Sequence, residues 1–223
     1  MDSKTLNLNN SETRKNTKTK NRAYKGMSAP SRVIKRTTDI IMSLVAIAVF
    51  ALPCVVIAWF IWNEDHHSPI YSQERIGRGG KPFMLYKFRS MRIDAESNGS
   101  PQLCQGHDSR LTRVGAFIRA HHLDEFPQLW NVLCGDMSFV GYRPERRYFI
   151  EKIMAINPDY QLLYATRPGI FSYATLHNGY TDSMEKMLTR LEMDLKYLEN
   201  QSLWGDMKII FDTAYAIISG KKI

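Results

Sequence analysis

The sequence contains few cysteines, and their arrangement excludes two kinds of protein. Three occur among 223 residues, at Cys54, Cys104 and Cys134. An odd number of widely separated cysteines forms no disulfide framework, and none of the intervals matches the spacing of zinc ligands. We therefore expect three free thiols in a reducing compartment.

The sequence also lacks a surplus of basic charge outside its amino-terminal end. The formal net charge is +8, and residues 1–36 account for all of it with ten basic and two acidic residues. The body therefore offers no basic surplus to a nucleic acid, and we expect no nucleic-acid partner. Because the basic end directly precedes an apolar stretch, it favours contact with anionic lipid.

Apolar and aromatic side chains are scarce in residues 1–31, which are rich in Asn, Ser, Thr and Lys. Such a segment buries too little surface to offset the entropy of ordering, so we interpret it as a flexible basic arm. A secretory signal is not expected, because the apolar run begins late and no small-residue cleavage site follows it.

Residues 40–62 contain no charged side chain, and as one helix they would be about 35 Å long, enough to cross a bilayer. Pro53 would bend this helix, because proline removes a backbone donor. The helix could cross the membrane, which the flanking charges mildly favour, or turn back at Leu52 and Pro53 as a re-entrant hairpin. A buried helix of a soluble protein is the weaker alternative, because the run exceeds ordinary helix lengths.

Two strands are expected at residues 69–76 and 82–91, joined by a glycine-rich turn at residues 77–80. Lys87 and Arg89 share one face of the second strand. Cations inside an apolar strand indicate an anion site, although cations on edge strands also discourage aggregation.

Two adjacent carboxylates, Asp124 and Glu125, stand where an apolar helical period begins. Pro127 is tolerated in a first turn, so we place the pair in the first turn of a helix that ends at Gly135. Unpaired backbone N–H groups at that position favour an ionised carboxylate, which suits a nucleophile or a metal ligand. The same residue types also occur in first turns merely as caps.

Arg119, Arg143 and Arg167 each stand near a glycine or proline turn. They could converge on an anionic substrate, or each could simply be solvated. His121 and His122 beside the carboxylate pair lack the spacing of zinc ligands.

Three further helices are expected: one from residue 109 or 112 to residue 122, and amphipathic ones at residues 182–200 and 204–219. Aromatic residues of the last helix suit either a core or the lipid interface. The elements together predict an α+β fold that is mainly helical, with a small β-hairpin. We divide the chain into the arm at residues 1–31, a membrane helix at residues 32–65 and a catalytic domain at residues 66–223.

The motifs, taken in order, resemble those of the bacterial sugar transferase family. These are monotopic phosphoglycosyl transferases, which begin the assembly of surface glycans on a polyprenyl phosphate. The resemblance runs from about Arg32 to the carboxyl end. Beyond the basic flank and the broken apolar helix, it rests on Tyr86-Lys87-Phe88-Arg89-Ser90-Met91, Leu123-Asp124-Glu125, Pro127-Gln128-Leu129, Asn131-Val132-Leu133, Gly135-Asp136-Met137-Ser138-Phe139-Val140-Gly141, Arg143-Pro144 and Arg167-Pro168-Gly169-Ile170.

The resemblance implies a re-entrant membrane helix broken at Pro53, with interfacial amphipathic helices and a catalytic body at the cytoplasmic face of the bacterial inner membrane. It implies transfer of a phosphosugar from a UDP-sugar to undecaprenyl phosphate with release of UMP, as the first membrane step of capsule, exopolysaccharide or O-antigen synthesis. Partners would be these two substrates and inner-membrane lipid, and a homo-oligomer is left open.

The resemblance also assigns roles to individual residues. Asp124 is expected as the nucleophile that forms a covalent phosphosugar ester, and Glu125 as its partner in proton transfer or in binding Mg²⁺, for which both carboxylates are candidate ligands. Phosphate and nucleotide contacts are expected from Lys87, Arg119, Arg143 and Arg167, and Asp194 is expected as a further polar member of the site.

Two departures from the family pattern concern the helix break and one loop. Leu52 replaces the usual serine before the helix-breaking proline, so the break lacks a hydroxyl for freed backbone groups. After Ile170, residues 171–180 replace the common Thr-Gly-Trp-Ala-Gln-Val-Asn-Gly-Arg pattern, and Tyr180 replaces its arginine. This departure could affect membrane-proximal packing, acceptor contacts or the choice of sugar.

Two alternatives to a transferase are a membrane-attached, magnesium-dependent phosphohydrolase of a lipid pyrophosphate and a non-enzymatic membrane scaffold. The phosphohydrolase would release phosphate without a sugar acceptor. The scaffold would tolerate Asp124→Asn.

Overall fold

A computed structural model describes residues 26–95, 108–179 and 181–219. The predicted arm lies almost wholly outside these residues, as do Cys104 and Tyr180. The expected α+β fold, mainly helical with one small hairpin, is confirmed. The elements in chain order are α2 (Ala29–Asp65), β1 (Ile70–Ile76), η1 (Arg78–Gly80), β2 (Pro82–Phe88), α3 (Arg113–Ala120), η2 (Leu123–Glu125), α4 (Gln128–Cys134), β3 (Ser138–Val140), α5 (Arg147–Ile156), η3 (Pro158–Ala165), β4 (Gly169–Phe171), α6 (Tyr173–Asn178), α7 (Met184–Glu199) and α8 (Leu203–Ile218), where η denotes a 3₁₀-helix.

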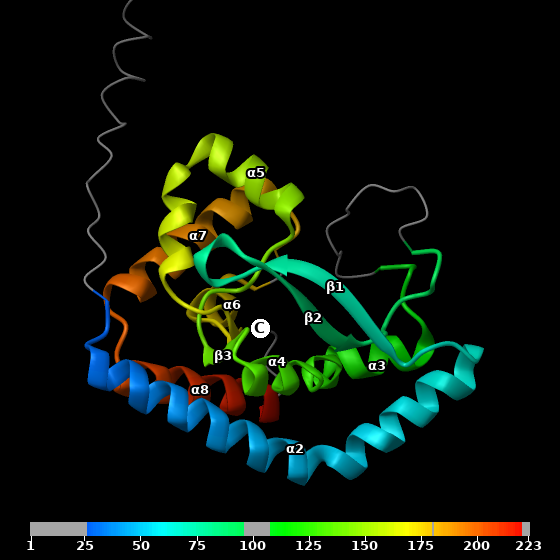
Figure 1. Ribbon diagram of the computed structural model, residues 1–223. Helices are drawn as coiled ribbons and strands as arrows, with labels where there is room; N and C mark the ends of the chain where they lie inside the picture. Colours follow the sequence, from blue (N-terminus) through cyan, green and yellow to red (C-terminus); the bar gives the residue numbers. More distant parts are fainter. Residues whose placement is uncertain (1–25, 96–107, 180, 220–223) are drawn as a thin grey trace, which may run out of the picture.

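The apolar run lies within α2, which begins after a Ser28 cap and ends at His66 in the left-handed conformation. Figure 1 shows that α2 is bent and extends along the base of the molecule. Pro53 lies inside the helix and explains the bend, because it removes one backbone hydrogen bond and clashes with the preceding turn. The helix is long and apolar enough to cross a membrane, and 6% of its most apolar 18-residue window is buried.

The amino-terminal half of α2 is attached to the body by buried polar contacts. Lys35 donates from Nζ to Asp206 of α8 at 2.5 Å and to the Val140 carbonyl at 3.0 Å. The Asp39 carboxylate accepts a hydrogen bond from the Phe139 N–H at 3.1 Å. These contacts join α2 to both β3 and α8.

The carboxyl-terminal end of α2 is attached to the same body. The Arg89 guanidinium, at the end of β2, pairs with both oxygens of Asp65. Glu64 accepts from the backbone N–H groups of Arg113 and Val114 at 2.8 and 3.2 Å, and so caps the amino-terminal end of α3. Both ends of the bent helix therefore contact one body, which lies along the inner side of the bend (Figure 1).

The hairpin pairs β1 with β2 in antiparallel register, from Ile70 opposite Phe88 to Ile76 opposite Pro82. Its turn lies at the predicted glycines, where Gly79 and Gly80 both have φ of 70°. Residues that carry a side chain rarely adopt this backbone conformation, so the turn requires glycine. The predicted hairpin is therefore confirmed.

The carboxylate pair lies one turn earlier than expected. Asp124 and Glu125 form the separate 3₁₀ turn η2, and α4 begins only at Gln128. Pro127 explains the correction: it has no N–H to bond the Leu123 carbonyl, so the Phe126 N–H takes that acceptor at 3.4 Å in a tighter turn. The predicted end of α4 at Gly135 is confirmed, since this residue is the left-handed C-cap.

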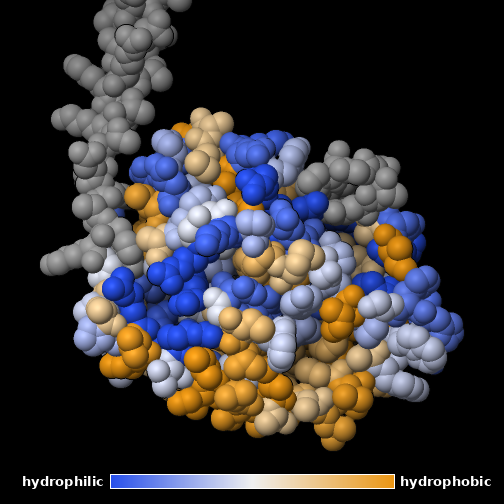
Figure 2. Space-filling model, in the orientation of Figure 1, coloured by the Kyte–Doolittle hydropathy of each residue, from blue (hydrophilic) through white to orange (hydrophobic). Residues whose placement is uncertain are grey.

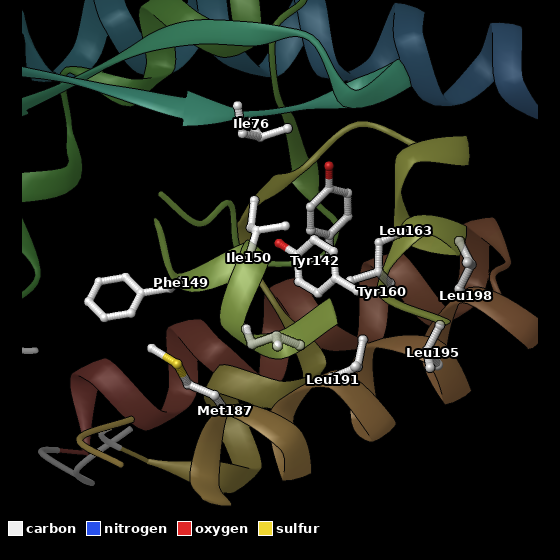
Figure 3. Packing of buried hydrophobic residues seen from close by; sticks show 11 residues of the cluster. Ile76, Tyr142, Phe149, Ile150, Tyr160, Leu163, Met187, Leu191, Leu195 and Leu198 are labelled. Carbon is white, nitrogen blue, oxygen red and sulfur yellow. The ribbon is translucent and has the colours of Figure 1, made fainter. Parts of the chain in front are cut away.

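The largest buried cluster joins α5, η3 and α7 to the end of β1 (Figure 3). A second cluster packs α4, β3, β4 and α8 against the amino-terminal half of α2, and a third packs its other half against β2 and α3. The two halves of α2 thus contribute to different clusters, and the hairpin and η2 lie between them.

The short strands β3 and β4 pair in parallel, with Ser138 opposite Gly169 and Val140 opposite Phe171. The two strands approach so closely that a Cβ on Gly169 would lie 2.1 Å from the Gly141 nitrogen. A side chain would force the strands apart, so glycine is required here. The pair holds the loops that carry Arg143 and Ser172 next to each other.

Candidate active site

One cavity, with a volume of about 730 Å³, reaches from the inner side of α2 to α6 and α7. It brings together five of the residues predicted from the sequence. Asp124, Glu125, Lys87, Arg119 and Arg143 all line it. They come from η2, β2, the end of α3 and the loop after β3, so residues distant in sequence meet at one site.

Glu125 is the charge-compensated member of the pair. Its Oε1 accepts from Lys87 Nζ and from Arg143 Nη2, both at 3.0 Å. Burial by itself would raise the pKa of this carboxyl, but the two cations outweigh burial and hold the pKa well below its usual range. Glu125 is therefore ionised, as expected, although Lys87 and Arg143 rather than helix N–H groups are the cause.

Asp124 is 7% exposed and accepts no hydrogen bond from any described residue. Burial raises the pKa of its carboxyl, and the neighbouring Glu125 charge adds to this, while Lys87, Arg119 and Arg143 oppose it. The sequence predicted a lowered pKa, which favours the ionised form. This prediction is wrong for Asp124, because desolvation dominates and raises the pKa. A desolvated carboxylate without hydrogen-bond donors is a stronger nucleophile than a solvated one.

The inner side of α2 is part of the same site. Phe50, three residues before Pro53, stacks on Phe126 with ring centroids 4.6 Å apart. Both rings line the cavity, as does Ala46. The residue directly after the carboxylate pair is thus in contact with the apolar helix.

Asp194 does not line the cavity and is 2% exposed. Its carboxylate accepts from the Ser172 hydroxyl at 2.9 Å and from the backbone N–H of Arg143. Burial raises its pKa to about 7, against the opposing effects of Arg190 and of these two donors. Asp194 therefore fixes the backbone of Arg143 and the cap of α6 from behind the site.

Arg167 also lies away from the cavity lining. Its Nε donates to the Gly135 carbonyl at 2.7 Å, at the end of α4. The structure thus separates this arginine from Lys87, Arg119 and Arg143, with which the sequence grouped it.

A second charged group in the cavity was not anticipated. Glu145 accepts from Arg75 at 3.1 Å and from Arg190, and all three line the cavity. Burial opposes ionisation of Glu145, but the two arginines hold its pKa below the usual value. A sequence signal did exist, because Arg190 and Asp194 share the helical face of Met187 and Leu191, where charges are rare.

The carboxylates suit a divalent ion that is bound together with substrate. Within the described ranges, no group of three or more His, Cys, Asp or Glu residues could hold a metal on its own. Mg²⁺ needs only one or two carboxylates when phosphate oxygens supply further ligands. Among the described residues, neither Asp124 nor the second oxygen of Glu125 accepts a hydrogen bond, and both fit this donor set.

The fold and the site together define a protein with a long apolar helix whose inner side meets a buried carboxylate pair surrounded by cations. Comparison with known families agrees with this class. Residues 30–220 match the model of the bacterial sugar transferase family, and the chain belongs to that family.

Curated relatives of this chain carry related names. It is 39% identical over 187 residues to the UDP-N-acetylgalactosamine-undecaprenyl-phosphate N-acetylgalactosaminephosphotransferase of Aeromonas hydrophila, covering 84% of this chain and 44% of the relative. It is 36% identical over 191 residues to the UDP-glucose:undecaprenyl-phosphate glucose-1-phosphate transferase of Escherichia coli K12, covering 85% and 41%. A Caulobacter vibrioides protein of the latter name is 36% identical over 187 residues, covering 83% and 70%. The chain thus spans less than half of the first two relatives.

Proposed function

We propose that this protein transfers a phosphosugar from a UDP-sugar to undecaprenyl phosphate and releases UMP. The names of the relatives support the two substrates. The observation that carries the mechanism is the contrast within the carboxylate pair: Glu125 is held by two cations, whereas Asp124 is buried without a donor.

The first displacement uses Asp124 as the nucleophile. A carboxylate oxygen bonds to the sugar-bearing phosphorus of the UDP-sugar, and the bond from that phosphorus to the bridging oxygen breaks. UMP leaves with the electron pair, and the sugar phosphate remains as an ester of Asp124. No proton is consumed in this exchange of one phosphorus–oxygen bond for another.

The second displacement regenerates the carboxylate. A phosphate oxygen of undecaprenyl phosphate attacks the same phosphorus, and the bond to Asp124 breaks. The products are the free Asp124 carboxylate and a polyprenyl diphosphate sugar. Two steps allow one site to serve a water-soluble donor first and a lipid acceptor second. The contact of Phe50 with Phe126 supports this order, because it joins the apolar helix α2 to the residue after the carboxylate pair.

Cations are needed because an anionic nucleophile must approach an anionic pyrophosphate. Lys87 and Arg143 already balance Glu125, and Arg119 lines the same cavity. Their excess positive charge would neutralise the charge of the donor phosphates. Mg²⁺, bound by Asp124 or Glu125 together with substrate, would supply further neutralisation of the phosphate oxygens.

We also propose that α2 is a re-entrant helix and that the body lies at the cytoplasmic face of the bacterial inner membrane. Attachment of both ends of α2 to one body supports this, because a straight crossing helix would carry one end to the other side. Trp204, Phe211 and Tyr215 of α8 are 66–82% exposed and suit the lipid interface. The product would begin the assembly of a surface glycan.

The covalent ester can be observed by mass spectrometry of the intact protein. We expect the purified protein to gain the mass of one sugar phosphate when incubated with Mg²⁺ and its UDP-sugar without acceptor, and to lose it when undecaprenyl phosphate is added. Asp124→Asn should gain no mass. A mass gain in this variant would place the ester on another residue, and acceptor turnover without any ester would favour direct transfer.

A further inference from the structure

Two arginines converge on the end of α4, away from the cavity. Arg36 of α2 donates to the Val132 and Leu133 carbonyls at 2.6 and 2.9 Å. Arg167 donates to the Gly135 carbonyl at 2.7 Å, and a Cβ on Gly135 would lie 3.3 Å from Arg36 Nη2. Arg36 and Arg167 therefore converge on one helix end.

The hairpin turn carries a third arginine, Arg78, close to these two. The turn packs on η3, where a Cβ on Gly80 would lie 3.5 Å from the Tyr164 ring, three residues before Arg167. Arg78 is exposed in this turn. Burial lowers the pKa of the Arg167 guanidinium, and the nearby charges of Arg78 and Arg36 lower it further.

Neighbouring guanidinium groups repel one another unless an anion lies between them. Among the described residues, the guanidinium of Arg78 donates no hydrogen bond, and neither do the two terminal nitrogens of Arg167. Asp39 and Asp136 lie near and offset part of this charge. Neither forms an ion pair with the arginines in the described chain: Asp39 accepts from the Phe139 N–H, and Asp136 accepts from Asn131. Unused guanidinium donors in a positive cluster suit a phosphate group.

The position of the cluster indicates which phosphate it would bind. Arg36 lies four residues before the uncharged run of α2 begins, at the level where lipid headgroups would surround the helix. In Figure 2, hydrophilic side chains gather directly beside the hydrophobic band along the base of the molecule. We propose that Arg36, Arg78 and Arg167 form a binding site for the phosphate of an anionic membrane phospholipid, separate from the catalytic cavity.

This site would fix the depth and tilt of the body on the membrane. An anionic headgroup would connect α2, the hairpin turn and the loop after η3, three segments that otherwise meet only through protein contacts. The proposal rests on the membrane placement of α2, but it does not depend on the covalent mechanism.

The test measures lipid binding by the purified full-length protein in a neutral detergent. Short-chain phosphatidylglycerol, short-chain phosphatidylcholine or inorganic phosphate is added, and the unfolding temperature is followed against concentration. Arg78→Glu is the informative variant, because Arg78 caps no carbonyl in the described chain. Lys152→Glu on α5, at the opposite end of the body from α2 (Figure 1), carries the same charge change as a control.

We expect phosphatidylglycerol alone to raise the unfolding temperature, and Arg78→Glu to weaken its apparent affinity at least about tenfold, as loss of one charge-assisted contact predicts. Lys152→Glu should bind like the unmodified protein. Equal stabilisation by phosphatidylcholine, or by inorganic phosphate at the same concentration, would overturn the phospholipid assignment, and equal weakening in both variants would overturn the site. If Arg78→Glu unfolds at a lower temperature without lipid, Arg78→Gln replaces it, and its apparent affinity for phosphatidylglycerol is judged in the same way. UMP release, measured separately, reports on the proposed function and not on this site.

Discussion

At the scale of single residues, the site depends on two neighbouring carboxylates that have different surroundings. Glu125 accepts from Lys87 and Arg143, while Asp124 is buried without a donor. One backbone turn thus presents a charge that is already balanced and a charge that is still available for reaction. The cations that balance Glu125 also stand beside Asp124 and can be shared with an incoming phosphate.

Lys87→Ala should therefore lower kcat/KM for the UDP-sugar by about 10–100-fold, because one cation of the phosphate site is lost. Nucleotide release at low substrate concentration measures the effect. Lys152→Ala, which removes an exposed cation on α5, serves as the control and should leave kcat/KM unchanged. An unchanged kcat/KM in Lys87→Ala would exclude this lysine from substrate binding.

Asp194 makes the stability of the protein depend on pH. Its carboxyl has a pKa of about 7 in the folded protein, against roughly 3.9 when unfolded. The folded state binds more protons between these values, so this group destabilises the fold progressively as pH rises from about 4 to about 7. With about 1.4 kcal/mol per pKa unit, the full effect is at most about 4 kcal/mol.

Asp194→Asn removes the titrating group while keeping an acceptor for Ser172. We expect the unfolding temperature of the unmodified protein to fall relative to that of Asp194→Asn as pH rises from 5 to about 7, with little further change above. Parallel pH curves for the two proteins would show that Asp194 is already ionised well below neutral pH.

At the scale of elements, α2 is held at both ends and bent between them. The polar contacts at Lys35 and Asp39 belong to one half, and those at Glu64 and Asp65 to the other. A straight helix of the same length could not make both sets of contacts. Pro53 is therefore the residue on which the proposed re-entrant placement depends.

Pro53→Ala should straighten the helix and carry its carboxyl-terminal end across the membrane. The measurement uses cysteines at Ser3 or Lys196, in a protein without native cysteines, and an impermeant thiol reagent on intact cells. Both positions should be protected when Pro53 is present, and the Lys196 position should become labelled in Pro53→Ala. Labelling of Lys196Cys with Pro53 in place would contradict the re-entrant helix.

Elements with a long apolar period were predictable from sequence. The run in α2, the glycine turn of the hairpin, and helices α3, α7 and α8 appear close to their expected bounds. Helix α5 was missed, because its buried face of Phe149, Ile150 and Ile153 is short and follows a proline turn. The boundary between η2 and α4 was also missed. It depends on the hydrogen bond that the Leu123 carbonyl cannot accept from Pro127, which has no N–H.

At the scale of the whole molecule, tertiary pairing decided which charges meet. The parallel pair of β3 and β4 joins segments about thirty residues apart and has no local sequence signal. It places Arg143 at the cavity, whereas Arg167, from the loop before β4, lies at the end of α4. Turn arginines look alike in sequence, so their separation into two clusters could not be predicted.

The arrangement also gives the molecule two faces of different character. Apolar side chains of α2 and α8 gather along one side, and the cavity with its carboxylates lies between that side and the body. A lipid acceptor could then approach from the apolar side while the nucleotide sugar comes from water. This geometry suits a mechanism in which Asp124 holds the phosphosugar covalently between the two substrates.

Phosphosugar transfer through Asp124 is tested most directly by the identity of the nucleotide that is released. The purified protein is incubated with Mg²⁺, undecaprenyl phosphate and a panel of UDP-sugars, with Asp124→Asn alongside. We expect UMP from the accepted sugar, and a loss of at least about 10³-fold in the variant. Release of UDP would instead mean transfer of the sugar without its phosphate and would contradict a phosphosugar ester on Asp124.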